Sequence, residues 1–138
     1  MKARATAVLP ALLLLAGCLD DATTPSVAMG SEFVLRPSEA VSLAGTDAAL
    51  RFEAVAGDSR CPADALCITA GDATAVFTLT RGGASTNLSL QTAGEGRRAT
   101  LEGLTLTLVR LDPYPYSSRP ISPSDYRALL RADPAFDR

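Results

Sequence analysis

The sequence contains no histidine among its 138 residues. Histidine is the commonest general base and the commonest metal ligand in proteins, so the chain lacks the usual side chain for both roles. Pairs in which histidine activates serine or cysteine are impossible within this chain, and so is a zinc site of the histidine type. Aspartate, glutamate, tyrosine and arginine remain for catalysis, but the composition favours a protein that is not an enzyme and that holds no metal or cofactor.

Positive charge is also scarce. The single lysine is Lys2, and the formal net charge of the chain is −2. When Lys2 and Arg4 are set aside with the N-terminal segment, 11 arginines stand against 15 acidic residues, a balance of −4. No stretch is strongly basic, so a nucleic-acid partner is not expected. Electrostatic attachment to anionic lipid is not expected either.

The first 17 residues have the three parts of a secretory signal. Lys2 and Arg4 supply positive charge, residues 5–17 are almost wholly apolar, and small residues end the segment. A transmembrane helix needs roughly 20 apolar residues, and Pro10 interrupts this shorter run. A buried core helix is the alternative interpretation, but the position at the extreme N-terminus favours a signal.

The end of this segment, Leu15-Ala16-Gly17-Cys18, resembles the lipobox of bacterial lipoproteins. The resemblance implies cleavage before Cys18, diacylglycerol on its thiol and acylation of the new amino terminus. Two or three acyl chains hold a protein firmly, since each buried CH₂ contributes about 0.8 kcal/mol. An ordinary cleaved signal with a chance cysteine is the alternative. By resemblance to enterobacterial sorting, Leu19 in place of aspartate favours the outer membrane, with the domain in the cell envelope facing the periplasm.

Residues 18–138 number 121, enough for one domain with its own core. Residues 18–31 are small and polar and contain Pro25 and Gly30, so they are expected to form a flexible tether. The folded domain is expected to cover residues 32–138.

From residue 32 onward, short apolar alternations are separated by turn residues, a pattern typical of β-strands. The expected strands are 33–36, 40–43, 50–55, 73–80 and 88–90, with more in 99–111. Arg81-Gly82-Gly83 predicts a hairpin turn. About seven short strands with regularly spaced turns favour an all-β fold, an antiparallel β-sandwich (immunoglobulin-like or similar), with a barrel as the alternative.

The alternation changes phase twice between residues 99 and 111. Leucines occupy the even positions from 104 to 108, whereas Leu101 and Leu111 are at odd positions. Gly103 predicts a turn or bulge at the first change, and a second bulge is expected near Leu108.

Residues 122–131 have two interpretations. Ser122 followed by Pro123 predicts the start of a helix, and the alanine, leucine and arginine that follow are good helix formers. A final strand beginning near Tyr126 is the alternative.

Cys61 and Cys67, six residues apart, are expected to form a disulfide outside the cytosol. So short a loop would stabilise the fold by about 2 kcal/mol on the chain-entropy model. A catalytic dithiol is the alternative, but redox sites usually have two residues between the cysteines and a setting that stabilises the thiolate. Cys18 is then the odd cysteine, and lipidation accounts for it.

The segment around Cys61 carries a second resemblance. A group of small bacterial envelope proteins has similar motifs, which stand here as Asp58-Ser59-Arg60-Cys61-Pro62, Cys67, Ala70-Gly71, Leu111-Asp112-Pro113-Tyr114-Pro115 and Asp125-Tyr126. The match spans about residues 50–130. Thr69 departs from the pattern, because tryptophan commonly precedes Ala-Gly in that group. The resemblance implies an all-β fold that ends in a strand, and it implies no activity.

The candidate binding residues are Asp58, Arg60, Asp64, Tyr114 and Tyr116. Alternating proline and tyrosine in an extended segment resembles peptide-recognition surfaces only loosely. Packing of the tyrosine rings over an open end of the sandwich is the alternative.

Asp58, Asp64 and Asp72 surround the predicted disulfide. Calcium needs six to eight oxygen ligands, and this spacing matches no EF-hand or repeat calcium loop. Side-chain hydrogen bonds within turns are therefore the expected role of these aspartates. Arg60 is expected to pair with one of them at the surface, which would contribute about 0 to 1 kcal/mol.

Three functions are compatible with these features. The first is a membrane-anchored, monomeric binding or structural module whose partner is an envelope protein or a glycan. The second is a protease inhibitor that presents the loop between Cys61 and Cys67. The third, ranked last, is a hydrolase that uses two close carboxylates.

Overall fold

The computed structural model describes residues 23–136. The predicted signal (1–17) and Cys18 lie outside the described residues, so both stay predictions. No helix within residues 23–136 is long and apolar enough to cross a membrane.

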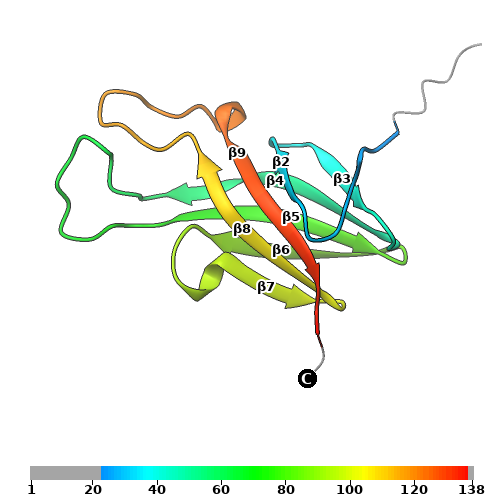
Figure 1. Cartoon of the computed structure of the whole chain (residues 1–138). Coiled ribbons are helices and arrows are strands. Elements are labelled where there is room, and N and C mark those ends of the chain that lie inside the picture. The colour runs from blue at the N-terminus through cyan, green and yellow to red at the C-terminus, as the bar shows by residue number, and fades with distance from the viewer. Residues whose placement is uncertain (1–22, 137–138) are drawn as a thin grey trace, which may run out of the picture.

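Two β-sheets pack face to face, which confirms the predicted all-β sandwich (Figure 1). The first sheet has the order β1-β3-β4-β5-β6, with β1 (Ser26–Val27), β3 (Ala40–Leu43), β4 (Ala48–Asp58), β5 (Ala73–Arg81) and β6 (Ala84–Gln91). The second has the order β2-β9-β8-β7, with β2 (Glu32–Leu35), β9 (Arg127–Pro134), β8 (Leu104–Asp112) and β7 (Arg98–Leu101). Two short 3₁₀ helices, η1 (Glu95–Arg97) and η2 (Pro123–Asp125), lie in the connections.

The core lies between the sheets and is made by the alternating apolar residues. In β5, Ala73, Ala75, Phe77 and Leu79 are buried, while the residues between them are half-buried on the outer face. Phe77 stacks on Phe52 of β4, with ring centroids 5.0 Å apart. Each large apolar side chain that is fully buried contributes about 1.5–3 kcal/mol, so the period-2 pattern fixes which face of each strand points inward.

Both predicted phase changes between residues 99 and 111 are confirmed. Gly103 has a φ of +73° and, with Glu102, forms the turn between β7 and β8. The second change is a bulge, because the pairing of β8 with β9 shifts register between Leu108 and Arg110. The bulge lets both Leu108 and Leu111 point into the core.

The strand interpretation is right for residues 127–131, and the helix interpretation is right only for one 3₁₀ turn that precedes them. η2 gives a single turn over Pro123–Asp125, after which β9 continues to Pro134. β9 lies between β2 and β8 and buries Ala128, Leu130 and Ala132 completely. Pairing on both edges outweighs the weak helix preference of the composition.

The prediction of a flexible tether over residues 18–31 is wrong for its last residues. β1 pairs in parallel with β3, and the Ser42 N–H donates to the Pro25 carbonyl, 2.8 Å away. The Gly30 N–H donates to the Ala132 carbonyl of β9 at 2.7 Å. Val27 packs against the core. These contacts extend the folded domain back to at least Pro25.

Candidate functional site

Two long connections project from the same end of the sandwich (Figure 1). Residues 59–72 follow β4 and form what we call the disulfide loop, and residues 113–126 follow β8 and form the tyrosine loop. Together they make the double loop. β1 pairs with Ser42 and Leu43, next to the turn that begins β4, whereas the double loop lies where β4 ends. The 11 residues of β4 span roughly 35 Å, so the first described residues and the double loop lie at opposite ends.

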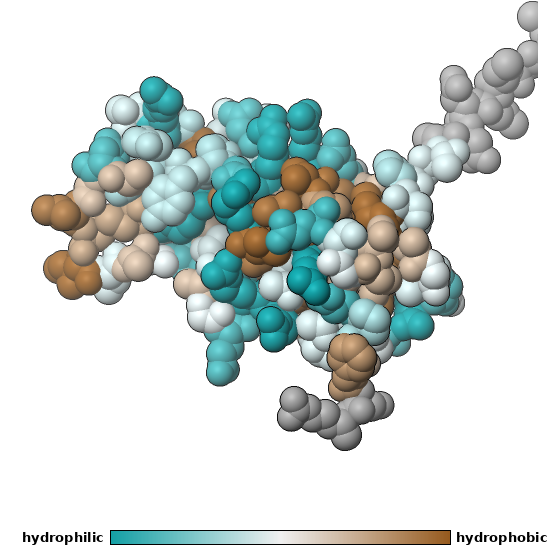
Figure 2. All heavy atoms as spheres, viewed as in Figure 1, coloured by the Kyte–Doolittle hydropathy of each residue, from teal (hydrophilic) through white to brown (hydrophobic). Residues whose placement is uncertain are grey.

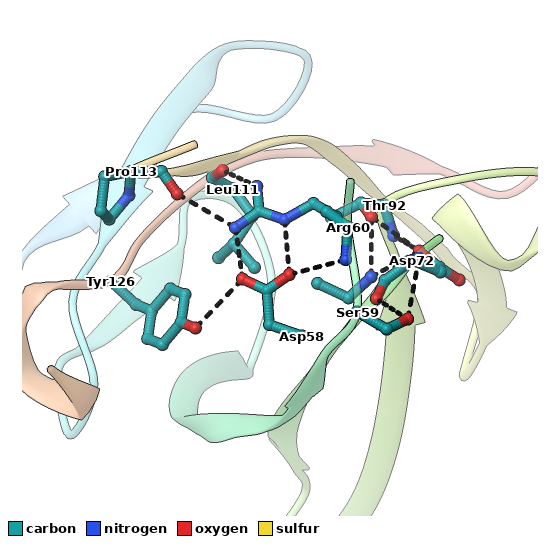
Figure 3. A network of polar contacts seen from close by, with 9 residues as sticks. Asp58, Ser59, Arg60, Asp72, Thr92, Leu111, Pro113 and Tyr126 are labelled. Atoms are coloured by element: carbon teal, nitrogen blue, oxygen red, sulfur yellow. Dashed lines mark hydrogen bonds and ion pairs between the residues drawn. The ribbon is translucent and has the colours of Figure 1, made fainter. Parts of the chain in front are cut away.

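Arg60 fixes the base of the double loop. Its side chain is the one buried charged group among residues 23–136, with 8% of the residue exposed. It binds the Asp58 carboxylate through two bonds, from Nε to Oδ1 at 2.8 Å and from Nη2 to Oδ2 at 2.6 Å (Figure 3). Nη1 also donates to the Leu111 carbonyl at 2.7 Å, and Nη2 to the Pro113 carbonyl at 3.0 Å. One guanidinium therefore joins the ends of β4 and β8.

Tyr126 completes this buried network. Its hydroxyl donates to Asp58 Oδ2 at 3.1 Å (Figure 3), and 8% of the residue is exposed. Burial raises the pKa of the Asp58 carboxyl, but hydrogen bonds and positive charge from Arg60 outweigh burial, so the pKa is lowered overall. Burial and the charge of Asp58 raise the pKa of Tyr126. The ionised carboxylate is thus the form that this network stabilises.

The two ends of the disulfide loop lie against each other near Gly71. The Ser59 N–H donates to the Asp72 carbonyl and the Cys61 N–H to the Ala70 carbonyl, both at 2.7 Å. Gly71 lies opposite Ser59 with a φ of +67°, and a Cβ there would stand 1.7 Å from the Ser59 carbonyl oxygen. A side chain at position 71 would therefore prevent this close backbone approach.

Asp72 joins the base of the disulfide loop to the connection that follows β6. Its Oδ1 accepts from the Thr92 N–H at 2.9 Å, the Thr92 hydroxyl at 2.6 Å and the Ala93 N–H at 3.1 Å. Thr92 and Ala93 lie about twenty residues further along the chain, so these bonds are long-range and are not the local turn bonds that the sequence predicts. The Ala73 N–H donates to the same oxygen at 2.7 Å and is a local bond of the predicted kind. Its oxygens serve the fold.

Two hydrogen bonds besides that of Arg60 hold the loops against each other. The Ala63 N–H donates to the Pro115 carbonyl at 2.9 Å, and the Ser117 N–H donates to Asp64 Oδ1 at 2.8 Å. The Ser117 N–H lowers the pKa of the exposed Asp64 carboxyl. Because one bond uses backbone only, part of this contact is independent of side-chain identity.

The predicted disulfide between Cys61 and Cys67 is confirmed, with the two Cα atoms 5.9 Å apart. It closes a small ring whose turn is held by the Ala65 N–H donating to the Pro62 carbonyl at 3.1 Å. Beside and just beyond the second cysteine, Leu66 and Ile68 are each 105% exposed. We call these two side chains the apex, and Figure 2 shows hydrophobic residues at the far end of the double loop.

Sequence reasoning missed the apex. The exposure of these two residues could have been predicted. Both are large and aliphatic and lie inside or next to a disulfide ring whose cysteines are six residues apart, and so short a ring has no interior in which to bury them. An exposed leucine alone needs no explanation. Two such side chains, separated by one residue and both fully exposed, form a distinct surface.

The five candidate binding residues divide into two groups. Arg60 is buried and the side chain of its partner Asp58 is 11% exposed, so the predicted surface ion pair is wrong. The carbonyls that enclose Arg60 belong to residues about fifty positions later in the chain. Asp64 joins the loops. Tyr114 and Tyr116 are 51% and 49% exposed, and each has an arginine guanidinium over its ring. Packing over the end of the sandwich, the alternative role for the tyrosines, applies to Tyr126 alone.

Neither a metal-binding group in residues 23–136 nor a pair of carboxylates in four surface hollows is found. Residues 23–136 contain no group of three or more metal-ligating side chains. Each of four surface hollows has one acidic residue in its lining, respectively Glu95, Asp112, Asp133 and Asp125. None of these four hollows holds the pair of carboxylates that the hydrolase hypothesis requires.

Comparison of the chain with protein-family models, with curated proteins and with solved structures found no match. The resemblances to lipoproteins and to the small envelope group therefore stay predictions.

Proposed function

We propose that this chain is an envelope lipoprotein, held at the membrane by acyl groups on Cys18, whose double loop binds another protein. In this proposal the domain acts by binding and has no catalytic role. The observation that carries it is the apex, where Leu66 and Ile68 are fully exposed on a loop that a disulfide and a buried ion pair hold in place.

The rigidity of the double loop supports a role in recognition. A flexible loop loses affinity when binding orders it, by about 0.5–1.5 kcal/mol for each side chain that becomes fixed. Here the Cys61–Cys67 disulfide, the Arg60 network and the two bonds between the loops fix the backbone before any partner arrives. Binding at the apex would therefore lose little conformational entropy.

The charge of the disulfide loop favours a protein over a lipid bilayer. The disulfide loop contains Asp64 and Asp72, and its one basic residue, Arg60, is buried and paired with Asp58, so the loop presents no free positive charge. Surfaces that insert apolar side chains into anionic membranes usually add basic residues, each contributing about 1 kcal/mol near the surface. Two aliphatic side chains on a loop without free positive charge instead suit an apolar pocket of another protein.

The position of the apex is also compatible with an N-terminal anchor. The described chain begins at the end of the sandwich opposite the double loop (Figure 1). A tether from Cys18 would therefore leave the apex uncovered.

The proposal is tested by capture from envelope extracts with the lipidated full chain as bait. The apex variant carries Leu66→Ser and Ile68→Ser. The matched control is Val34→Ser, which removes a half-exposed aliphatic side chain (51% exposed) from β2, outside the double loop. We expect one protein to be captured by the wild type and the control and lost with the apex variant, while all three give the same thermal midpoint. Equal capture by all three baits, or none by any, contradicts the proposal.

Inhibition of a peptidase is a second candidate, and the ring that presents Leu66 favours it. A small closed loop with an exposed apolar side chain beside a disulfide can enter a substrate cleft and resist unfolding there. The test is an assay of the purified chain against a panel of serine and cysteine peptidases. Absence of inhibition at micromolar concentration excludes this candidate and leaves the binding proposal standing.

A further inference from the structure

β6 is an open edge of the first sheet. All eight of its residues, Ala84–Gln91, pair with β5 without a register shift, and no strand within residues 23–136 pairs with its other side. β7, the nearest edge of the second sheet, pairs with β8. An edge strand presents a row of unpaired N–H and C=O groups, which can accept another extended chain.

The usual protections of an edge are missing from β6. Folded proteins protect edges with charged residues, proline, bulges or very short strands. The β6 sequence ASTNLSLQ has no charged residue and no proline, its pairing has no bulge, and it is eight residues long. The other three edges are protected, because β1 has two residues, and β2 and β7 have four each and carry Glu32 and Arg98.

The N-terminal part of β6 is accessible. Residues 84–87 are all exposed. At the other end, η1 lies close, since a Cβ at Gly96 would stand 2.1 Å from the Gln91 side-chain oxygen. The open stretch therefore runs from Ala84 to about Ser89.

The side chains of β6 suit pairing with an identical strand. Leu90 is buried and Leu88 packs against the core, so the odd-numbered residues face outward. These are Ser85, Asn87, Ser89 and Gln91. All are neutral, so an antiparallel copy places no like charges opposite each other, which would otherwise destabilise the pair. Thr78 and Thr80 of β5 continue this neutral surface beside them.

We propose that two copies of this chain associate through β6, antiparallel, so that their first sheets join into one ten-stranded sheet. This differs from the monomer expected from the sequence, because strand order, which decides the edges, is set by the tertiary fold. A single-strand contact is small, so the dimer is of the weak class that depends on local concentration. The apex is at the end of each sandwich and takes no part in this contact.

The test uses cysteine scanning of the full chain in bacterial cells. Ser85→Cys, Asn87→Cys and Ser89→Cys are made singly, and a short bismaleimide linker is added to bridge offsets of two residues. Ser118→Cys, exposed in the tyrosine loop, is the matched control, and the unaltered chain gives the background of the native cysteines. We expect a cross-linked dimer of this chain from at least one β6 position, several-fold above the control.

A second variant separates strand pairing from chance encounter. Ser85→Lys with Ser89→Lys places like charges across the joined edge, and we expect it to remove the cross-link formed through Asn87→Cys. Lysine at Ser117 and Ser118 adds the same charge elsewhere and should leave the cross-link intact. No dimer above control at any β6 position overturns the proposal. So does a cross-link that joins β6 to another protein only, or one that survives both edge lysines.

Discussion

Replacing Arg60 with methionine removes the buried cation that joins the ends of β4 and β8. The Asp58 side chain, 11% exposed, would remain without its ionic partner. The carbonyls of Leu111 and Pro113 would each lose a donor. Removing one member of a buried ion pair typically destabilises a protein by about 3–5 kcal/mol. Methionine keeps much of the apolar length of the side chain, so this change tests charge and hydrogen bonding more than volume.

We expect a loss near the lower end of that range, about 3 kcal/mol. The Tyr126 hydroxyl and the N–H of residue 60 still donate to the Asp58 carboxylate and partly compensate it. For a domain of this size each kcal/mol lowers the thermal midpoint by about 4 °C, so the midpoint should fall by roughly 12 °C. A typical domain is stable by 5–15 kcal/mol, so the variant should remain folded at 25 °C unless the wild type is at the bottom of that range.

Urea and thermal unfolding followed by far-UV circular dichroism measure this loss. Arg119→Met is the matched control, because Arg119 is exposed and its guanidinium lies 5.9 Å from the Tyr116 ring centroid. The control should change stability by no more than about 0.5 kcal/mol. If Arg60→Met lies within 1 kcal/mol of Arg119→Met, the buried network does not hold the double loop as argued.

Three further predictions concern single features. Gly71→Ala should abolish the cooperative thermal transition, since its Cβ would meet the Ser59 carbonyl oxygen. The control, Gly83→Ala, has open space around it and should lower the free energy of unfolding by about 1–2 kcal/mol. A normal melting curve for both variants would refute the close approach at Gly71. The lowered pKa of Asp58 stabilises the fold above the pKa of an unfolded aspartate, about 4, and this stability is lost as pH falls through the pKa of the folded state. Asp58→Asn should therefore flatten the dependence of stability on pH below pH 4 in urea titrations, and an unchanged slope counts against the prediction. Cys18→Ser should move the chain from the membrane fraction to the soluble fraction, and unchanged fractionation contradicts the lipid anchor.

Local pattern was sufficient for most strands and for the disulfide. Side chains alternate with a period of two along a strand, so buried residues of β5 such as Phe77 can be assigned to one face without knowledge of the rest. The bulge near Leu108 could be predicted for the same reason, because a change of phase requires an extra residue. Local pattern did not predict β1, since its two residues carry no periodicity and are held by backbone bonds to β3.

The candidate site was located from sequence but its roles were assigned only in part. The segment around Arg60 is indeed where the loops converge, yet the expectation of a surface ion pair failed. Burial of Arg60 depends on carbonyls at Leu111 and Pro113, which are adjacent only after β4 and β8 are in place. The apex was missed for the complementary reason, since apolar residues such as Leu66 usually indicate a core position.

The sequence by itself determined which segments become most of the strands, which cysteines pair and that histidine chemistry is absent, because each depends on residue type and short-range spacing. The tertiary structure alone decided which charges are buried, which apolar side chains remain exposed and which strand is left at an unprotected edge. Burial and strand order depend on contacts between residues far apart in the chain. The double loop and the free side of β6, which carry both proposals, are products of that long-range order.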